Sequence, residues 1–464
     1  MCGICGIWSP ANADPTDAAR LMFFALYALQ HRGQESAGIA ATDGREMRFV
    51  RRMGLVGQVF AEPDLHELTG RAAIGHTRYS TTGSSRIENA QPMVVRDGRL
   101  GELAIGHNGN VIDARERRET LASEGIPFDT SSDTEVMAKA IAFARGGTWD
   151  EKIDAGLASI RGAWSLTMLT PTALYAVRDP FGVRPLVLGR KDGSWLAASE
   201  TCALDTIGAE FVREVDPGEV VRIDDDGPET VARHTAERRA LCVFEHVYLA
   251  SASSDMDGRS IYATRERMGE RLAREHPADA DVIIPVPDSA IPAAVGYARE
   301  TGVPFREGLI KNRYIGRTFI QPSQELRRHS VALKYNALRD VLDGKRVVVV
   351  DDSIVRGSTS GPIVDLVRRN GAREVHMRIC SPPIRWSCHF GVDMARKDEL
   401  IAARLDVEAI RRHIGADTLG YLSLDGMVGA TGLGEDDFCT ACFTGDYPIP
   451  VQLELTKEVL EVGR

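Results

Sequence analysis

The amino-acid sequence predicts two joined domains of different class. Residues 2–235 are expected to form an α+β domain, and residues 236–464 an α/β domain with a helical and then irregular C-terminal tail. The 464 residues suffice for two or three domains of ordinary size. In the first part, short apolar runs are separated by Gly, Pro and Asp turns. In the second part, apolar runs alternate with helical patterns, which is typical of a parallel sheet.

The elements of the first part follow from the spacing of apolar residues. Strands are expected at residues 103–105, 166–169, 186–188 and 220–223, and helices at 17–29 and 134–144. An acidic turn, Asp224-Asp225-Asp226-Gly227, ends this part. Beyond it, strands at 282–284 and 347–350 are expected to alternate with helices at 290–301 and 362–370. We therefore place the domain boundary between residues 230 and 245.

Composition and charge limit the classes of function. Hydrophobic residues make up 43% of the chain and charged residues 26%, as in ordinary globular proteins. A net charge of −10 disfavours a general nucleic-acid binder. No apolar run reaches the roughly 20 residues of a membrane span, and no secretory signal is present. Eight Cys residues in so long a chain do not suggest a disulfide scaffold. We expect a cytoplasmic protein with reduced or metal-bound thiols.

The chain begins Met1-Cys2-Gly3, which offers an unusual nucleophile. Removal of Met1 would leave Cys2 with a thiol and a free α-amino group on one residue. Such an amino group titrates near pH 7.7–8.0, so it can accept the thiol proton at physiological pH. Either removal of Met1 alone exposes Cys2, or the numbering starts from a trimmed chain. The alternative is an incidental Cys at a frayed chain end.

The strongest internal motif runs from Lys345 to Ser360. Four Val residues fit a strand buried on both faces, and Asp351 and Asp352 follow at its C-terminal end. The next loop carries Arg, Gly and hydroxyl side chains and leads into a helix with Pro362 in its first turn. Such a helix start suits a phosphate, and the two Asp could hold sugar hydroxyls or Mg²⁺. The motif lacks the Gly-Lys-Ser/Thr of a Walker A loop. A buried strand ending in a solvated acidic turn is the alternative.

This segment resembles the phosphoribosyl pyrophosphate (PRPP) loop of type I phosphoribosyltransferases. Together with Cys2-Gly3-Ile4, it makes the whole chain similar to the glutamine PRPP amidotransferase family. The resemblance implies an N-terminal-nucleophile glutaminase sandwich followed by a type I phosphoribosyltransferase domain. It also implies the reaction of glutamine, PRPP and water to 5-phosphoribosylamine, glutamate and pyrophosphate, the first step of de novo purine (IMP) synthesis, with ammonia passing between two sites. Inhibition by purine nucleotides and a homotetramer are further implications.

Four short motifs carry the glutaminase resemblance: residues 31–34, 75–81, 107–110 and 131–135. By resemblance, Cys2 is the nucleophile, Asn108 and Gly109 form the oxyanion hole, and Arg78 and Asp133 bind the α-carboxylate and α-amino group of glutamine. The chemistry is consistent, because a guanidinium offers a bidentate fork to a carboxylate and amide N–H groups stabilise an oxyanion. Each motif taken alone fits a solvated loop equally well. Cys5, His31 and His76 are expected to be structural.

The resemblance also assigns the PRPP site. Ser289, in the strand-to-helix segment 284–290, would complete a Mg²⁺ shell with Asp351 and Asp352. Residues 306–346 hold 10 Lys and Arg against 4 Asp and Glu, so this stretch suggests a flap over a polyanion, or else a solvated basic face or a nucleic-acid contact. In the linking segment, Ser251-Ala252-Ser253-Ser254 departs from the family pattern. The expected PRPP contacts are Asp351, Asp352, Ser353, Arg356, Gly357, Ser358, Thr359, Ser360, Lys311 and Arg317.

Cys439 and Cys442 form a Cys-x-x-Cys pair, which fits a redox pair, half a zinc site or half an iron–sulfur site. The spacing does not separate these. The family resemblance, in its iron–sulfur subclass, implies a [4Fe–4S] cluster on Cys242, Cys388, Cys439 and Cys442. Four unligated Cys are the alternative. Cys202 and Cys380 are expected to be core thiols.

Two other functions share parts of this pattern. A PRPP-sensing transcriptional regulator would need a DNA-binding domain, and no recognition-helix pattern is seen. A glucosamine-phosphate or asparagine synthetase would share the glutaminase half, but the loop from Asp351 to Ser360 argues against both.

Overall fold

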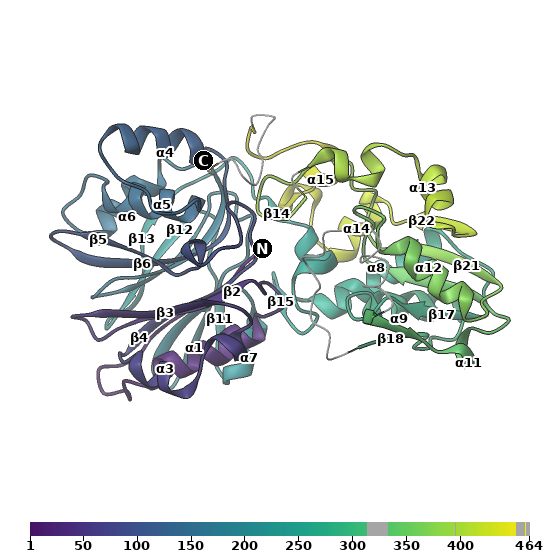
Figure 1. The fold of residues 1–464 in the computed structure, drawn as a ribbon, viewed down its shortest axis with the longest axis horizontal. Coiled ribbons are helices and arrows are strands. Elements are labelled where there is room, and N and C mark those ends of the chain that lie inside the picture. Colours follow the sequence, from purple (N-terminus) through teal and green to yellow (C-terminus); the bar gives the residue numbers. More distant parts are fainter. Residues whose placement is uncertain (313–332, 395, 452–459, 461–464) are drawn as a thin grey trace.

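The computed structural model describes residues 1–312, 333–394, 396–451 and 460. Figure 1 shows two halves side by side, with the N-terminus lying between them. Arg317, one of the expected PRPP contacts, lies outside the described residues. In the part of the chain that the structure describes, no helix is long and apolar enough to cross a membrane.

The first half is built on two antiparallel sheets. The seven-stranded sheet has the order β11 (Glu210–Glu214), β9 (Val187–Lys191), β10 (Ser194–Ala198), β1 (Gly3–Trp8), β4 (Ala72–Arg78), β2 (Ser36–Thr42) and β3 (Met47–Met53). The six-stranded sheet has the order β13 (Gly227–Arg233), β12 (Glu219–Asp224), β8 (Leu174–Arg178), β7 (Gly162–Leu169), β6 (Gly101–Val111) and β5 (Met93–Asp97). β1 is the central strand of the seven-stranded sheet, and Cys2, the residue just before it, is buried.

Helices cover the outer faces of both sheets, which gives four layers (Figure 1). The seven-stranded sheet packs against α1 (Asp17–Ala28), α2 (Val56–Val59), α3 (Glu62–Glu67) and α7 (Thr201–Ile207). The six-stranded sheet packs against α4 (Ala114–Ser123), α5 (Asp133–Ala142) and α6 (Trp149–Leu157). Between the sheets, Ile4 and Ile74 pack against Leu174 and Val221. This arrangement confirms the expected sandwich of two sheets.

The second half contains a parallel sheet in the order β17 (Val282–Pro285), β20 (Arg346–Asp351), β21 (Glu374–Ile379) and β22 (Thr418–Tyr421). Val348 and Val350 of β20 belong to one core cluster, and Val347 and Val349 to the cluster on the other face. The four valines are therefore buried on both faces, as the sequence predicts. The main helices are α8 (Ile261–Glu275), α9 (Ile291–Thr301), α12 (Ser360–Arg369), α13 (Val407–Ile414) and α14 (Leu424–Thr431).

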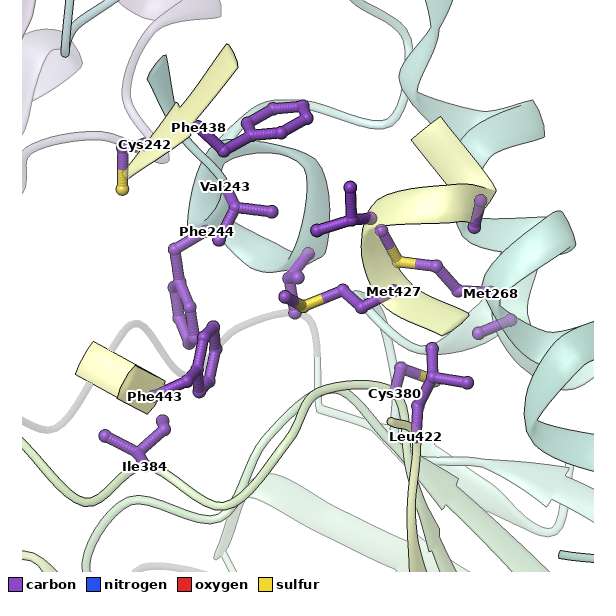
Figure 2. Packing of buried hydrophobic residues seen from close by; sticks show 14 of the residues in the cluster. Cys242, Val243, Phe244, Met268, Cys380, Ile384, Leu422, Met427, Phe438 and Phe443 are labelled. Atoms are coloured by element: carbon purple, nitrogen blue, oxygen red, sulfur yellow. The ribbon is translucent and has the colours of Figure 1, made fainter. Parts of the chain in front are cut away.

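Shorter elements join the two halves. The parallel pair β14 (Leu241–Cys242) and β23 (Phe438–Cys439) lies beside α15 (Ala441–Thr444), and a five-residue π-helix, η2 (Glu245–Leu249), follows β14. Figure 2 shows Phe244 and Phe443 of this region packed together, with ring centroids 6.3 Å apart. The remaining short elements are β15 (Asp255–Met256), β16 (Arg259–Ser260), β18 (Leu309–Lys311), β19 (Tyr335–Ala337), α11 (Arg339–Leu342), η1 (Ile87–Asn89), η3 (Lys397–Glu399), η4 (Ile401–Ala403) and η5 (Glu435–Asp437).

Two expected strands differ from the observed ones in an instructive way. The strand expected at 103–105 lies in the first half of the much longer β6, which runs through the whole 107–110 motif. Gly and Asn have low strand propensity, but pairing with β7 outweighs that preference. The strand expected at 186–188 corresponds to β9, which starts only at Val187, after Pro185. Pro185 has no N–H to donate to a ladder.

Candidate active sites

Three segments hold Cys2 immediately before β1. Its thiol donates to the carbonyl oxygen of Tyr79 at 3.6 Å, at the end of β4. Its backbone N–H donates to Oδ1 of Asn108 at 3.1 Å, and its carbonyl oxygen accepts from Nε of Arg32 at 3.0 Å. Cys2 is buried. The residue is therefore fixed in place by its neighbours, unlike an incidental Cys at a frayed end.

Met1 is also buried, and its amino group lies 3.5 Å from the carbonyl oxygen of Tyr79. Burial lowers the pKa of this amino group to about 5. With Met1 attached, Cys2 has an ordinary amide N–H, which cannot act as a base. The same nitrogen would become the free α-amine on removal of Met1.

Asn108 presents a donor that nothing in the described structure uses. The side chain is fully buried on β6, where Oδ1 accepts from Cys2 while Nδ2 has no hydrogen-bond partner among the described residues. A buried amide N–H without a partner is costly, so its presence beside a thiol needs an explanation. The next residue, Gly109, has φ +155°, and a Cβ there would lie 1.9 Å from the carbonyl oxygen of Ala163. Only glycine fits at this position.

Arg78 and Asp133 lie on the two elements that flank this region. Arg78 ends β4, and its guanidinium donates to the carbonyl oxygens of Thr82 and Ser84 at 3.2 and 3.1 Å. Asp133 starts α5 and accepts at 3.0 Å from the N–H of Val111, which is on the same strand as Asn108. Both side chains are buried. The structure thus brings the motifs at 75–81, 107–110 and 131–135 together around Cys2.

The second site lies at the C-terminal end of β20. The Asp352 carboxylate accepts hydrogen bonds from the hydroxyls of Ser289 at 2.5 Å and Ser353 at 2.6 Å. The backbone N–H of Asp352 donates to Oδ1 of Asp351 at 2.9 Å. Burial and the neighbouring Asp352 carboxylate raise the pKa of Asp351 well above its usual range. Two buried carboxylates and a hydroxyl are the hard oxygen ligands that Mg²⁺ prefers, so these residues fit that ion.

The loop after Asp352 leads to the start of α12. Ser358 and Thr359 are exposed there, and Thr359 makes no side-chain capping hydrogen bond to the helix. The first N–H groups of such a helix suit a phosphate. Gly357 has φ +74° and no room for a Cβ, which would lie 2.7 Å from Ile401. Arg356 is paired with Glu399 at 2.7 Å.

Lys311 and Ser360 are the other expected PRPP contacts in the described residues. Lys311 ends β18 and is paired with Asp288, next to Ser289, at 2.5 Å. Ser360 is buried as the first residue of α12.

Four cysteines gather where the two halves meet. Cys242 of β14 and Cys439 of β23 are opposite each other in the register of this parallel strand pair, and Cys442 lies in α15, directly after β23. Burial raises the pKa of the Cys442 thiol, and the neighbouring thiols of Cys242, Cys388 and Cys439 raise it further. All four thiols therefore lie close together. None of them is in a disulfide. Cys202 and Cys380 are buried elsewhere, as core thiols would be.

Cysteine thiolates are the ligands of iron–sulfur clusters, so the residue types gathered here fit that group. Within the described residues, no group of three or more His, Cys, Asp or Glu side chains is arranged to hold one metal ion. The Arg184 guanidinium lies near Cys242 and Cys388, where it would offset thiolate charge.

Sequence reasoning missed several residues around Cys2. Arg32 lies in the quoted 31–34 motif but had no assigned role, although it contacts the Cys2 carbonyl. Its ion-pair partners, Glu200 and Glu245, carried no local signal in the sequence. His31 lies 2.8 Å from Glu200.

Comparison with known proteins supports the same two-part organisation. A glutamine amidotransferase domain model matches residues 76–206, and a phosphoribosyl transferase domain model matches residues 258–380. An amidophosphoribosyltransferase of Synechococcus elongatus is 49% identical, over 99% of this chain and 93% of the relative.

Two solved structures align over nearly the full length. One, described as the allosteric regulatory enzyme of purine biosynthesis, has a TM-score of 0.92 at 43% identity and covers 100% of this chain and 99% of its own. The other, glutamine PRPP amidotransferase from B. subtilis in complex with ADP and GMP, has a TM-score of 0.91 at 43% identity and covers 99% of this chain and 100% of its own. The chain therefore belongs to the amidophosphoribosyltransferase family.

Proposed function

We propose that this amidophosphoribosyltransferase divides its reaction between the two sites described above, with glutamine hydrolysed at Cys2 and PRPP aminated at the end of β20. The unpartnered Nδ2 of Asn108 beside the Cys2 thiol is the observation that carries the first assignment. The overall reaction turns glutamine, PRPP and water into 5-phosphoribosylamine, glutamate and pyrophosphate, in purine biosynthesis.

At the glutaminase site, Arg78 and Asp133 would hold the α-carboxylate and α-amino group of glutamine. The Cys2 sulfur attacks the amide carbon while the Cys2 α-amine, free after Met1 removal, takes the thiol proton. Nδ2 of Asn108 and the N–H of Gly109 stabilise the oxyanion that forms. The amine then returns the proton to the leaving nitrogen, and ammonia departs. Water hydrolyses the Cys2 thioester to release glutamate.

At the second site, the hydroxyl-rich loop and the start of α12 would hold the 5-phosphate of PRPP. Ser289, Asp351 and Asp352 would hold Mg²⁺, which supplies charge neutralisation to the pyrophosphate group when bound. Lys311, beside Ser289, offers a further cation on the pyrophosphate side. Ammonia forms a bond to C1 of the ribose as the bond to pyrophosphate breaks. Ammonia must arrive unprotonated, so the route that it takes from Cys2 has to exclude water.

The four gathered cysteines are proposed to hold a [4Fe–4S] cluster. When bound, the cluster supplies a covalent cross-link between β14, β23, α15 and the segment at Cys388. Cys242, Cys388 and the Cys439–Cys442 pair are distant in sequence but adjacent in space, which supports this assignment over a redox pair. Neither proposed active site uses these thiols, so the role is structural or oxygen-sensing.

Three broader properties follow from the family. A relative is described as complexed with ADP and GMP, and we propose that purine nucleotides inhibit this chain also. A homotetramer and a cytoplasmic location are proposed from the same resemblance.

The decisive experiment removes the nucleophile and keeps the second site. Cys2→Ala is expected to abolish glutamine-dependent phosphoribosylamine synthesis while ammonia-driven pyrophosphate release persists. Cys5→Ala is the matched control, because Cys5 is a buried thiol on β1 that packs toward the helices covering the seven-stranded sheet. Glutamine hydrolysis that is unchanged in Cys2→Ala would refute the site. Hydrolysis that does not rise with added PRPP would refute the coupling.

A further inference from the structure

We propose that Glu245 is a positioning residue for the glutaminase reaction, holding the nucleophile through Arg32 and, through Arg184, the segment 388–394 that contacts Gly109 and Asn110. The inference rests on the proposed role of Cys2. Glu245 opens the π-helix η2, in the second half of the chain, yet it contacts two arginines of the first half. Single π-turns are rare and occur frequently at functional sites.

On one side, Glu245 fixes the arginine that holds Cys2. Oε1 and Oε2 of Glu245 accept from Nη2 and Nη1 of Arg32 at 3.0 and 3.1 Å, a bidentate pair. Nε of the same guanidinium donates to the Cys2 carbonyl at 3.0 Å. Because a bidentate pair fixes the plane of the guanidinium, Glu245 sets where the Nε donor points. The Nε donor in turn sets the position of the Cys2 carbonyl, and therefore that of the thiol.

On the other side, Glu245 fixes the arginine that holds residues 388–394, here named the wall segment. Nη1 of Arg184 donates to Oε1 of Glu245 at 3.1 Å, and its Nε donates to the carbonyl oxygen of Phe390 at 3.0 Å. Phe390 lies in the wall segment, which begins at Cys388. The same carboxylate oxygen therefore joins the nucleophile to this segment through two guanidinium groups.

The wall segment lies directly against the residues that surround Cys2. Nδ2 of Asn110, two residues after Asn108, donates to the carbonyl oxygen of His389 at 3.0 Å. A Cβ on Gly391 would lie 3.0 Å from the carbonyl carbon and oxygen of Gly109. The hydroxyl of Tyr79 donates to Asp393 at 3.4 Å. A shift of this segment would thus displace the expected oxyanion hole.

Burial makes this network rigid. The side chains of Arg32, Arg184 and Glu245 have no solvent exposure, and neither does that of Glu200, the second carboxylate on Arg32. Burial alone would lower the pKa of Arg32, but Glu245 and Glu200 outweigh it and raise that pKa. Two cations therefore face two anions in this buried network. Val243 and Phe244, just before Glu245, are anchored in the core (Figure 2).

The test separates positioning from folding by using two nitrogen sources. Glu245→Gln keeps the length of the side chain and removes its charge. We expect kcat for glutamine-dependent synthesis to fall between about tenfold and a hundredfold, as for a misplaced catalytic group, with the KM for glutamine within about twofold of wild type. Ammonia-driven synthesis should stay within about twofold. Glu300→Gln is the matched control, because Glu300 pairs with Arg274 at a solvent-exposed site on α9.

A second variant keeps the test valid should Glu245→Gln fail to fold. Arg184→Lys keeps the positive charge but replaces the planar fork, whose separate nitrogens bond Glu245 and Phe390, with a single nitrogen, so it should give the same fall in kcat alone. An equal loss with glutamine and with ammonia, or a normal kcat with glutamine, would overturn the proposal. Cys2→Ala is assayed in parallel. If Cys2→Ala retains glutamine hydrolysis the site assignment fails, whereas if only the Glu245 and Arg184 variants behave as wild type the positioning role alone fails.

Discussion

Asn108 provides the sharpest test of the glutaminase chemistry, because its two side-chain atoms do different things. Oδ1 accepts from the backbone N–H of Cys2 at 3.1 Å, whereas Nδ2 has no partner among the described residues. Asn108→Ala removes both functions. Asn108→Asp keeps an oxygen acceptor for Cys2 and removes the N–H donor. The pair of variants therefore separates oxyanion stabilisation from the orientation of Cys2.

The size of each effect follows from the geometry. Loss of one oxyanion donor costs about 2.7–4 kcal/mol in the transition state, or roughly 10²–10³ in kcat. Loss of the acceptor leaves the buried N–H of Cys2 unpaired, at about 1–3 kcal/mol of folding stability. A typical domain has roughly 5–15 kcal/mol to lose, so Asn108→Ala should still fold. We expect both variants to lose at least about a hundredfold in kcat for glutamine.

The assay compares glutamine hydrolysis in the presence of PRPP with ammonia-driven pyrophosphate release, alongside thermal unfolding. Ammonia-driven activity should stay near wild type in both variants, because the second site does not use Asn108. The KM for glutamine should change little, since Arg78 and Asp133 are intact. A loss of less than about tenfold in kcat for Asn108→Asp would refute the reasoning. Nδ2 of Asn108 would then not stabilise the transition state.

Three further predictions address the second site, the fold and the cysteines. Asp352→Asn should lower kcat by at least about a hundredfold with either nitrogen source, because the carboxylate that meets Ser289 and Ser353 would lose the charge needed to hold Mg²⁺; activity retained with ammonia would contradict this. Burial raises the pKa of Asp179 to about 6, against the attraction of Arg178. Between the unfolded pKa near 3.9 and the folded pKa of about 6, the folded protein holds a proton on Asp179 that the unfolded chain has lost. The free energy of unfolding is therefore highest below pH 3.9 and falls by roughly 3 kcal/mol as the pH rises to about 6. Asp179→Asn should lack this term, and urea unfolding at pH 4.5 and 7 would expose the idea as wrong if both proteins had the same pH dependence. Anaerobic reconstitution with iron and sulfide should load about four irons per chain and give visible absorption in the wild type, while Cys388→Ser should hold less iron; equal iron in the two proteins would rule out Cys388 as a ligand.

Much of the fold was predictable because the signals were local. Four consecutive valines predict a strand buried on both faces. In the structure they belong to two core clusters, one on each face of the sheet. Helices at Asp17 and Asp133 followed from apolar spacing and begin where expected within one residue. The 107–110 motif was recognised for its chemistry but not as strand, because its Gly and Asn residues favour turns. Only pairing with β7 makes it part of β6.

The wider site was not predictable, because its contacts join residues that are far apart along the chain. Glu245 lies 213 residues from Arg32, and Phe390 lies 206 residues from Arg184. An isolated Glu in an apolar stretch gives no sign that two arginines from another domain will neutralise it. Such partners appear only once both sheets and the junction between the halves are formed. The sequence therefore identifies groups that react, whereas the groups that hold them come from tertiary structure.

The junction between the halves accounts for why these two chemistries share one chain. Residues that form the expected oxyanion hole contact the wall segment, and that segment begins at Cys388, one of the four gathered thiols. Arg184 lies between the thiols and Glu245, and Glu245 leads through Arg32 to the Cys2 carbonyl. A buried charge left without its partner costs several kcal/mol, so the two halves cannot separate slightly without breaking this chain of contacts. Correct placement of Cys2 thus depends on the second half of the chain, through Glu245 and the wall segment.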